Sequence, residues 1–135
     1  SRALKKGRIL GFLADQDGYI HGLPVPFLGQ ESSAVVGPAT FAQKFGSPVV
    51  PVFASRKPEG GHIVHILPPL YYVDSGNQDV DMYRLTEQCC QVTENFIKEH
   101  PTEWLWFQHR WNTKSDEIID YDKKMAIREL AHEKQ

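Results

Sequence analysis

The sequence has only two cysteines and no long apolar run. The first shortage argues against a protein held together by disulfides, and the second against a chain that spans a membrane. Cys89 and Cys90 are adjacent in a segment of helical pattern, where neighbouring side chains point in different directions. Neither a disulfide nor a pair of metal ligands is expected from them, and the chain fits a reducing compartment. Because no apolar run is long enough to cross a bilayer and no signal peptide is present, we expect the chain itself to be soluble.

The sequence also lacks a strong excess of charge of either sign. Its formal net charge is −2, with 24% charged and 41% apolar residues, which is ordinary for a globular protein. This balance argues against nucleic acid as a partner through bulk electrostatics. At 135 residues the chain has the length of one domain with a real core.

The first half of the chain has the strand–loop–helix order that is typical of α/β proteins. Short apolar runs predict buried strands over residues 8–14 and 49–54. Residues 15–30 are rich in glycine and proline and are expected to form a long loop. Ser32 or Ser33 can cap a helix that runs to about Phe45 and ends at Gly46. Residues 1–7 resemble the end of a helix that is stopped by a glycine.

The second half begins with a predicted turn at residues 58–61 and a more exposed strand over residues 62–67. An apolar stripe of helical period predicts a long helix over residues 79–99, which His100 and Pro101 stop. The aromatic run at residues 104–111 is expected to pack on the sheet as core, although its tryptophans would also suit a membrane interface. Residues 115–135 predict a polar helix or a frayed tail.

Asp15 and Asp17 directly follow the first predicted strand, and strand ends are where α/β proteins form sites. Residues i and i+2 of an extended segment lie on the same side, so both carboxylates can face one ligand. They could bind a divalent metal, orient a histidine or hold a cationic partner. The alternative is that they cap the turn before Gly18.

Two weaker signals concern phosphate groups. The loop with Phe27 and Gly29 precedes a helix start at Gly37, and free amides at a helix start can receive a phosphate, although loop geometry alone also explains such residues. Arg56 follows the second predicted strand and could clamp a phosphate with two hydrogen bonds, or be an ordinary surface arginine.

The six histidines do not supply a general base with a carboxylate partner at the five-residue spacing. The fifth residue after the first five histidines is never Asp or Glu, and for His132 that position lies beyond the given sequence. His62 and His65 are three apart in a predicted strand and therefore face opposite sides, which makes them a poor metal pair.

The order of these motifs resembles the carboxyl-terminal part of the lipid A late acyltransferases, the lauroyl/myristoyl acyltransferase family. The resemblance covers residues 4–112 and rests on the ordered series rather than on any one motif. The series is Ala14-Asp15-Gln16-Asp17, Val25-Pro26-Phe27-Leu28-Gly29, Gly37-Pro38-Ala39 with Phe41-Ala42, Pro48-Val49-Val50-Pro51 followed by Arg56, and Trp104-Leu105-Trp106-Phe107 ending in Arg110-Trp111.

The resemblance implies an α/β fold, namely a partial glycerol-phosphate-acyltransferase-like fold with a mixed sheet flanked by helices. Residues 1–113 would be the carboxyl-terminal portion of the acyltransferase domain, and residues 114–135 a charged helical or disordered tail. The implied reaction moves a fatty acyl chain from acyl carrier protein or coenzyme A to a hydroxyl of a lipid A-type glycolipid. It takes place at a membrane surface, the cytoplasmic face of the bacterial inner membrane, and needs no cofactor.

Catalysis in this family uses a His-x-x-x-x-Asp/Glu motif as general base, which lies upstream of the region that this chain resembles. The chain alone is therefore expected to be inactive. By resemblance Asp15 is a supporting acid at the catalytic site, and Asp17, Phe27, Gly29 and Arg56 bind substrate, with no metal. The sequence departs from the family pattern at Gln108, where a histidine is usual.

Two other functions remain open from the residues. Asp15-Gln16-Asp17 has the Asp-x-Asp form that holds a metal on a diphosphate in glycosyltransferases. The aromatic run at residues 104–111 would also suit a non-catalytic module that binds lipid or protein.

Overall fold

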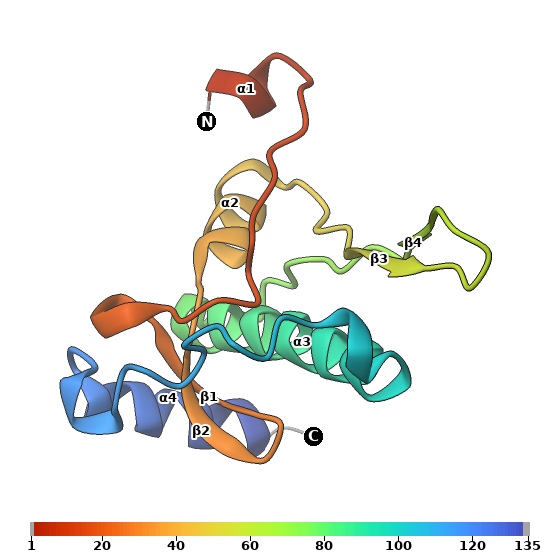
Figure 1. Cartoon of the computed structure of the whole chain (residues 1–135). Coiled ribbons are helices and arrows are strands. Elements are labelled where there is room, and N and C mark those ends of the chain that lie inside the picture. Colours follow the sequence, from red (N-terminus) through yellow and green to blue (C-terminus); the bar gives the residue numbers. More distant parts are fainter. Residues whose placement is uncertain (1, 134–135) are drawn as a thin grey trace.

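The computed structural model describes residues 2–133, and Ser1, which belongs to the predicted first helix end, lies outside them (Figure 1). The elements in chain order are α1 (Arg2–Lys5), η1 (Tyr19–His21), β1 (Leu23–Phe27), β2 (Gln30–Ala34), α2 (Gly37–Phe45), β3 (Val52–Arg56), β4 (His62–Ile66), α3 (Gln78–Glu99), η2 (Pro101–Glu103), η3 (Ser115–Glu117) and α4 (Tyr121–Glu133). The mixture of helices and strands confirms the α/β class. Within residues 2–133 the strands form two separate antiparallel hairpins, β1–β2 and β3–β4, where one mixed sheet was predicted.

The prediction of a loop over residues 15–30 is wrong, because β1 lies inside it and pairs with β2. The two prolines that indicated a loop, Pro24 and Pro26, are tolerated by the register of the hairpin. Phe27 pairs with Gln30 across the turn, so this pair exchanges hydrogen bonds and every second pair does not. Pro24 and Pro26 fall in the pairs without hydrogen bonds, where a missing N–H costs nothing.

Helix α2 begins later than the sequence predicted. Ser32 and Ser33 are buried residues of β2 and do not cap the helix. The helix instead begins at Gly37 with Pro38 in its first turn, a position that proline favours. Its predicted end is confirmed, since Gly46 has a φ of 62° and donates its N–H to the carbonyl of Ala42.

The long helix α3 is confirmed and forms the centre of the core. It begins behind Asn77, whose side chain accepts a hydrogen bond from the N–H of Val80 at 3.3 Å, and it stops before Pro101. Its buried face packs on β1 and α4. The main core consists of Val25, Phe27, Ala34, Val80, Tyr83, Cys90, Ile97 and Ala131. A smaller cluster of Ala39, Ala42 and Leu85 joins α2 to α3.

The charged end of the chain forms a packed helix, α4, as far as Glu133. The carbonyl of Ala131 is fully buried and accepts two hydrogen bonds from Arg84 of α3, at 3.1 and 3.2 Å. Of the two predictions for this segment, the helix is therefore confirmed within the described residues.

The two segments predicted as buried strands are largely exposed. Residues 8–14 have no regular secondary structure, and Ile9 and Leu13 are 96% and 73% exposed. The second predicted strand is shifted to β3, where Val52 is exposed. In Figure 1 the N-terminal segment extends past α2, and the β3–β4 hairpin projects from the rest of the molecule. An apolar run needs a neighbouring strand to become a buried strand, and residues 2–133 offer none to residues 8–14.

The exposed strand predicted over residues 62–67 is confirmed as β4, which pairs with β3 in antiparallel register. The predicted turn at residues 58–61 joins the two strands. Arg56, at the end of β3, pairs with His62 at the start of β4.

Candidate functional site

The segment that follows α3, residues 104–113, crosses the molecule and contacts several of the predicted site residues. Trp104 donates its ring N–H to Oδ2 of Asp15 at 3.0 Å. Gln108 donates its side-chain amide to the same oxygen at 3.2 Å. Gln108, which departs from the pattern implied by the resemblance, is therefore a hydrogen-bond partner of Asp15. Two neutral donors hold this half-buried carboxylate in one orientation.

Asp17 is more deeply buried, with 7% of its surface exposed. Its Oδ2 accepts hydrogen bonds from Thr113, from the hydroxyl at 2.6 Å and from the N–H at 3.2 Å. Its backbone forms an isolated bridge with Ala34 of β2. Asp17 therefore ties the end of the 104–113 segment to the β1–β2 hairpin.

Asp15 and Asp17 are held by different protein donors. Trp104 and Gln108 donate to one oxygen of Asp15. Both oxygens of Asp17 accept hydrogen bonds, Oδ2 from Thr113 and Oδ1 from the N–H of Tyr19 at 3.4 Å. Among residues 2–133 no group of three or more His, Cys, Asp and Glu side chains is placed to hold a metal ion. The arrangement gives no support to a metal-dependent glycosyltransferase that uses Asp15-Gln16-Asp17.

Phe27 is fully buried under the 104–113 segment. Its ring lies 5.7 Å from that of Trp104 and 6.0 Å from that of Trp111, measured between centroids. The indole N–H of Trp111 also donates to the carbonyl of Phe27 at 3.3 Å. Phe27 can therefore influence the site by holding this segment in place rather than by touching a ligand. The prediction that the aromatic run packs as core is confirmed for its two end residues.

Arg110 is a buried residue that belongs to the ordered motif series but was not predicted as a site residue. It is 1% exposed, lies 4.5 Å above the ring of Phe27, and donates from Nη1 to the carbonyl of Ser33 at 2.8 Å. Its Nε and Nη2 have no hydrogen-bond partner among residues 2–133. Burial lowers the pKa of Arg110, and the nearby Cys90 and Asp17 oppose that shift. The only feature of the sequence that could have indicated a special role for Arg110 is its position as a charged residue within an aromatic run.

Gly29 forms the tight turn of the β1–β2 hairpin together with Leu28. Both have positive φ, 78° and 49°, as a two-residue turn of the type I′ class requires. The N–H of Leu28 donates to Glu94 of α3 at 3.0 Å, which fixes the turn to the helix. Gly29 itself is exposed, and no atom lies within 4 Å of the position that a Cβ would take.

Arg56 lies at the end of β3 and bonds to the residues just before the 104–113 segment. Its Nε donates to Glu103 at 3.1 Å and its Nη2 to the carbonyl of Thr102 at 3.1 Å. The hydrogen bond from Arg56 lowers the pKa of Glu103. The Arg56 side chain is 64% exposed, so the rest of its guanidinium can bind an anion.

The β3–β4 hairpin also carries a serine–histidine pair. The hydroxyl of Ser55 and Nε2 of His65 lie 2.7 Å apart, and the rings of Phe96 and His100 pack on His65. Ser55 is buried, so its hydroxyl is not presented to a substrate. This pair is a cross-strand contact that stabilises the hairpin.

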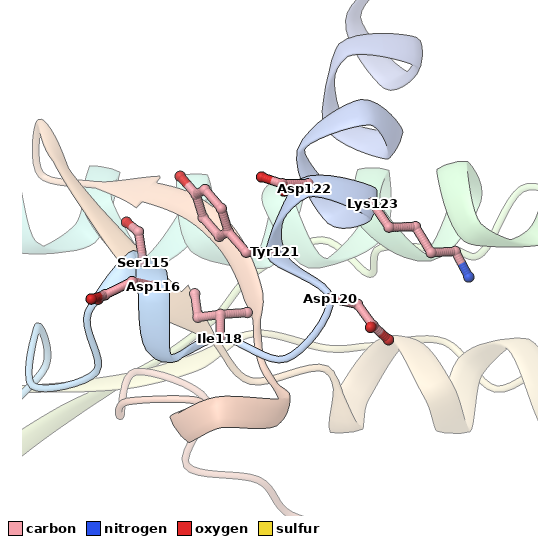
Figure 2. Close-up of a pocket in the computed structure, with 7 residues that line it drawn as sticks. All are labelled: Ser115, Asp116, Ile118, Asp120, Tyr121, Asp122 and Lys123. Atoms are coloured by element: carbon pink, nitrogen blue, oxygen red, sulfur yellow. The ribbon is translucent and has the colours of Figure 1, made fainter.

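One hollow of about 700 Å³ lies away from all of these residues (Figure 2). It is open and mainly acidic, and is lined by Ser115, Asp116, Ile118, Asp120, Tyr121, Asp122 and Lys123. None of its lining residues is one of the predicted site residues. A smaller hollow of about 230 Å³ does border the 104–113 segment, and it is lined by Gln30, Glu31, Ser32, Trp111, Thr113, Lys114, Ser115 and Ile118.

The comparisons with known proteins agree with the resemblance. Residues 1–113 match the family model described as bacterial lipid A biosynthesis acyltransferase. Over 123 residues the chain is 27% identical to a protein of Escherichia coli (strain K12) named lipid A biosynthesis lauroyltransferase. The match covers 87% of this chain but 38% of that relative, so the chain spans well under half of the relative's length. No helix described between residues 2 and 133 combines the length and apolar character needed to cross a bilayer.

Proposed function

Because the chain belongs to the bacterial lipid A biosynthesis acyltransferase family, we propose that residues 1–113 form the carboxyl-terminal portion of an acyltransferase domain with a glycerol-phosphate-acyltransferase-like fold. The observation that carries this proposal is the family match over those residues. Residues 114–135 lie beyond the match, and helix α4 within them packs on α3 through Ala131.

The proposed reaction transfers a fatty acyl chain to a hydroxyl of a lipid A-type glycolipid at the cytoplasmic face of the bacterial inner membrane. The donor is a thioester of acyl carrier protein or of coenzyme A. A base removes the proton of the acceptor hydroxyl, the oxygen attacks the thioester carbonyl, and the thiol leaves. None of the five histidines from His21 to His109 has Asp or Glu five residues later, so we assign the base to residues outside this region.

The chain contributes supporting groups to this reaction. Asp15 is held by Trp104 and Gln108 and keeps one carboxylate oxygen for a ligand or for the catalytic histidine. Arg56 presents an exposed guanidinium to a phosphate of the glycolipid. Asp17, Phe27 and Gly29 position the surrounding backbone and the 104–113 segment.

The first test asks whether the 135-residue chain is active on its own. We expect no acyl transfer from acyl carrier protein to a lipid A precursor, because the chain lacks the base. Transfer at a rate above the uncatalysed background would contradict the assignment of the base to other residues.

The second test asks whether Arg56 binds the acceptor. A detergent-dispersed, phosphorylated and acylated glucosamine disaccharide serves as the ligand, and its affinity is measured by calorimetry. We expect Arg56→Ala to weaken binding about tenfold or more, since a hydrogen bond to a charged group contributes about 1.5–3 kcal/mol. Arg128→Ala is the matched control, because Arg128 also bonds to a glutamate, Glu31, at 2.8 Å. Equal effects of the two substitutions would exclude a specific role for Arg56.

A further inference from the structure

The short helical turn η2 connects two of the proposed site residues, Arg56 and Asp15. The Nε of Arg56 donates to Glu103, the last residue of η2, at 3.1 and 3.4 Å from its two carboxylate oxygens. The next residue, Trp104, donates its ring N–H to Asp15 at 3.0 Å. Two consecutive residues therefore join the β3–β4 hairpin to the part of the chain that carries Asp15.

The ion pair between Arg56 and Glu103 can be exchanged for a ligand. The side chain of Arg56 is 64% exposed and that of Glu103 is 15% exposed. Such an exposed pair contributes little net stability, because water and salt screen it. A phosphate monoester that binds the remaining N–H groups of Arg56 brings nearly two negative charges beside the carboxylate of Glu103. It competes for the guanidinium and repels the carboxylate, and both effects loosen the pair.

Loosening this pair weakens the attachment of η2 to the hairpin. Arg56 also donates from Nη2 to the carbonyl of Thr102 at 3.1 Å, so one side chain holds two consecutive residues of the turn. Trp104 follows η2 directly in the chain. A movement of the turn therefore changes the position of the Trp104 indole relative to Asp15.

Asp15 is placed to respond to such a movement, whereas Asp17 is not. Asp15 is half-buried, and two neutral donors hold one of its oxygens, Trp104 and the side-chain amide of Gln108. If Trp104 withdraws, the carboxylate stays attached to Gln108 but can turn. Asp17 is buried, and both of its oxygens accept hydrogen bonds from other residues.

We propose that Glu103 is a positioning residue that couples the binding of a phosphate monoester at Arg56 to the orientation of Asp15. The inference rests on the proposed function, which assigns phosphate binding to Arg56 and a supporting role to Asp15. In the free protein Arg56 holds Glu103, and the adjoining Trp104 is kept on Asp15. When phosphate occupies Arg56, Glu103 and Trp104 move. The restraint on Asp15 is then relaxed, so the carboxylate is released for its catalytic partner only when the acceptor is bound.

The test is a titration of the 135-residue chain with glucose 1-phosphate at pH 7, followed by heteronuclear NMR. At this pH the ligand is mainly a dianion. The ring N–H signal of Trp104 reports its bond to Asp15, and Trp104→Phe identifies that signal. We expect it to shift in step with the Nε–H signal of Arg56 and to reach half of its full shift at the same ligand concentration.

The variant Glu103→Ala separates coupling from binding. Arg56 should still bind the phosphate, but the Trp104 signal should lose most of its shift, because Arg56 no longer holds the neighbouring residue. Glu103→Gln keeps an acceptor for Arg56 and should restore most of the response. Glu31→Ala is the matched control, since Glu31 also pairs with an arginine, Arg128, at 2.8 Å, and it should respond as the parent does. Thermal unfolding monitored by circular dichroism establishes that all variants remain folded.

A coupling between two sites acts equally in both directions, which gives a second measurement. Asp15→Ala removes the acceptor of the Trp104 ring, so η2 is less restrained. We expect this variant to bind glucose 1-phosphate about fivefold more tightly than the parent does. The gain should be absent when Asp15→Ala is combined with Glu103→Ala, because the connection between the two sites is then already broken.

The outcomes separate this inference from the proposed function. The coupling is overturned, and phosphate binding is retained, if the Arg56 signal shifts while the Trp104 signal does not, or if Glu103→Ala keeps the full Trp104 shift. An unchanged affinity in Asp15→Ala would overturn the coupling as well. If the Arg56 signal of the parent does not shift at all, the assignment of phosphate binding to Arg56 fails, and the inference fails with it.

Discussion

At the scale of single residues, buried polar side chains hold both distant and neighbouring parts of this chain together. Asp17 binds Thr113 across 96 positions of sequence, and Arg110 binds the carbonyl of Ser33 across 77. Asp81 is buried too, and accepts hydrogen bonds from the N–H and hydroxyl of Ser75 at 2.8 and 2.6 Å. Each of these groups has lost water, so removing its partner leaves an unsatisfied polar atom in the core.

Asp17→Ala should lower the free energy of unfolding by about 1–3 kcal/mol, because it leaves the hydroxyl and N–H of Thr113 without their acceptor. Urea denaturation followed by circular dichroism measures the change. Asp116→Ala is the control, since Asp116 is exposed and should change stability by no more than about 0.5 kcal/mol. Equal stability of the two variants would show that Asp17 is not structural and would strengthen its assignment as a substrate-binding residue.

The two cysteines should be unreactive in the folded protein. Burial raises the pKa of Cys89 to about 12 and that of Cys90 to about 11, so almost no thiolate exists at pH 8. We expect slow labelling by a disulfide reagent at pH 8 and rapid labelling of both thiols in denaturant. Complete labelling of the native protein within the mixing time would contradict the burial.

The same shifts predict a loss of stability in alkaline solution. A thiol pKa that is higher in the folded protein than in the unfolded chain makes the folded state bind protons more tightly. The stabilisation is complete below the unfolded pKa near 9 and falls as the pH rises through about 11. Urea unfolding at pH 8 and pH 10.5 should show the decrease, and a Cys89→Ala, Cys90→Ala double variant should show a smaller one.

At the scale of elements, a helix or strand could be predicted from the sequence where local interactions form it. It could not be predicted where it depends on residues elsewhere in the chain. Helix α3 could be predicted because its apolar period and its stop at Pro101 are local. The β1–β2 hairpin could not, because prolines in β1 are acceptable only once the register with β2 is known. The exposure of residues 8–14 depends on whether a neighbouring strand exists, which their own sequence does not contain.

The candidate site could also be predicted only in part from the sequence. The strand-end argument identified Asp15 and Asp17 as polar residues with a role, but it placed them on one side of an extended strand that does not form. Their partners Trp104, Gln108 and Thr113 lie about 90 residues later in the chain, and only the tertiary fold brings them together. Arg110 was missed because burial of an arginine depends on tertiary contacts.

The N-cap of α3 gives a prediction that concerns one element. Asn77→Ala removes the side-chain acceptor of the Val80 N–H and should destabilise the protein by about 1 kcal/mol. Asn77→Asp keeps an acceptor at the cap and should retain most of the stability. Urea denaturation of both variants checks the prediction, which is wrong if alanine and aspartate behave alike.

At the scale of the whole molecule, the accessible surface is larger than the mass predicts. A folded monomer of 15.4 kDa should expose about 7,200 Å² by the usual scaling, whereas the chain exposes 8,791 Å². The excess, about 1,600 Å², is what one partner contributes to a large, hydrophobic interface. Much exposed apolar surface lies on residues 9–13 and on the β3–β4 hairpin, which are segments of strand-like sequence.

We therefore predict that the 135-residue chain self-associates in solution. Residues 8–14 offer unpaired backbone groups and aliphatic side chains, which pair readily with another strand edge. Sedimentation velocity should show a mass that rises with protein concentration. Ile9→Lys should weaken the association about tenfold, because a charge then replaces an aliphatic side chain in the contact.

Phe107→Lys is the control, since Phe107 is comparably exposed at 91% but lies in the 104–113 segment, outside residues 8–14. If self-association uses strand edges, Phe107→Lys should leave the dependence of the mass on protein concentration unchanged. A monomer at all concentrations with cooperative unfolding would contradict the prediction. The exposed aliphatic surface would then be compatible with the folded chain alone, and the excess area would need no covering partner.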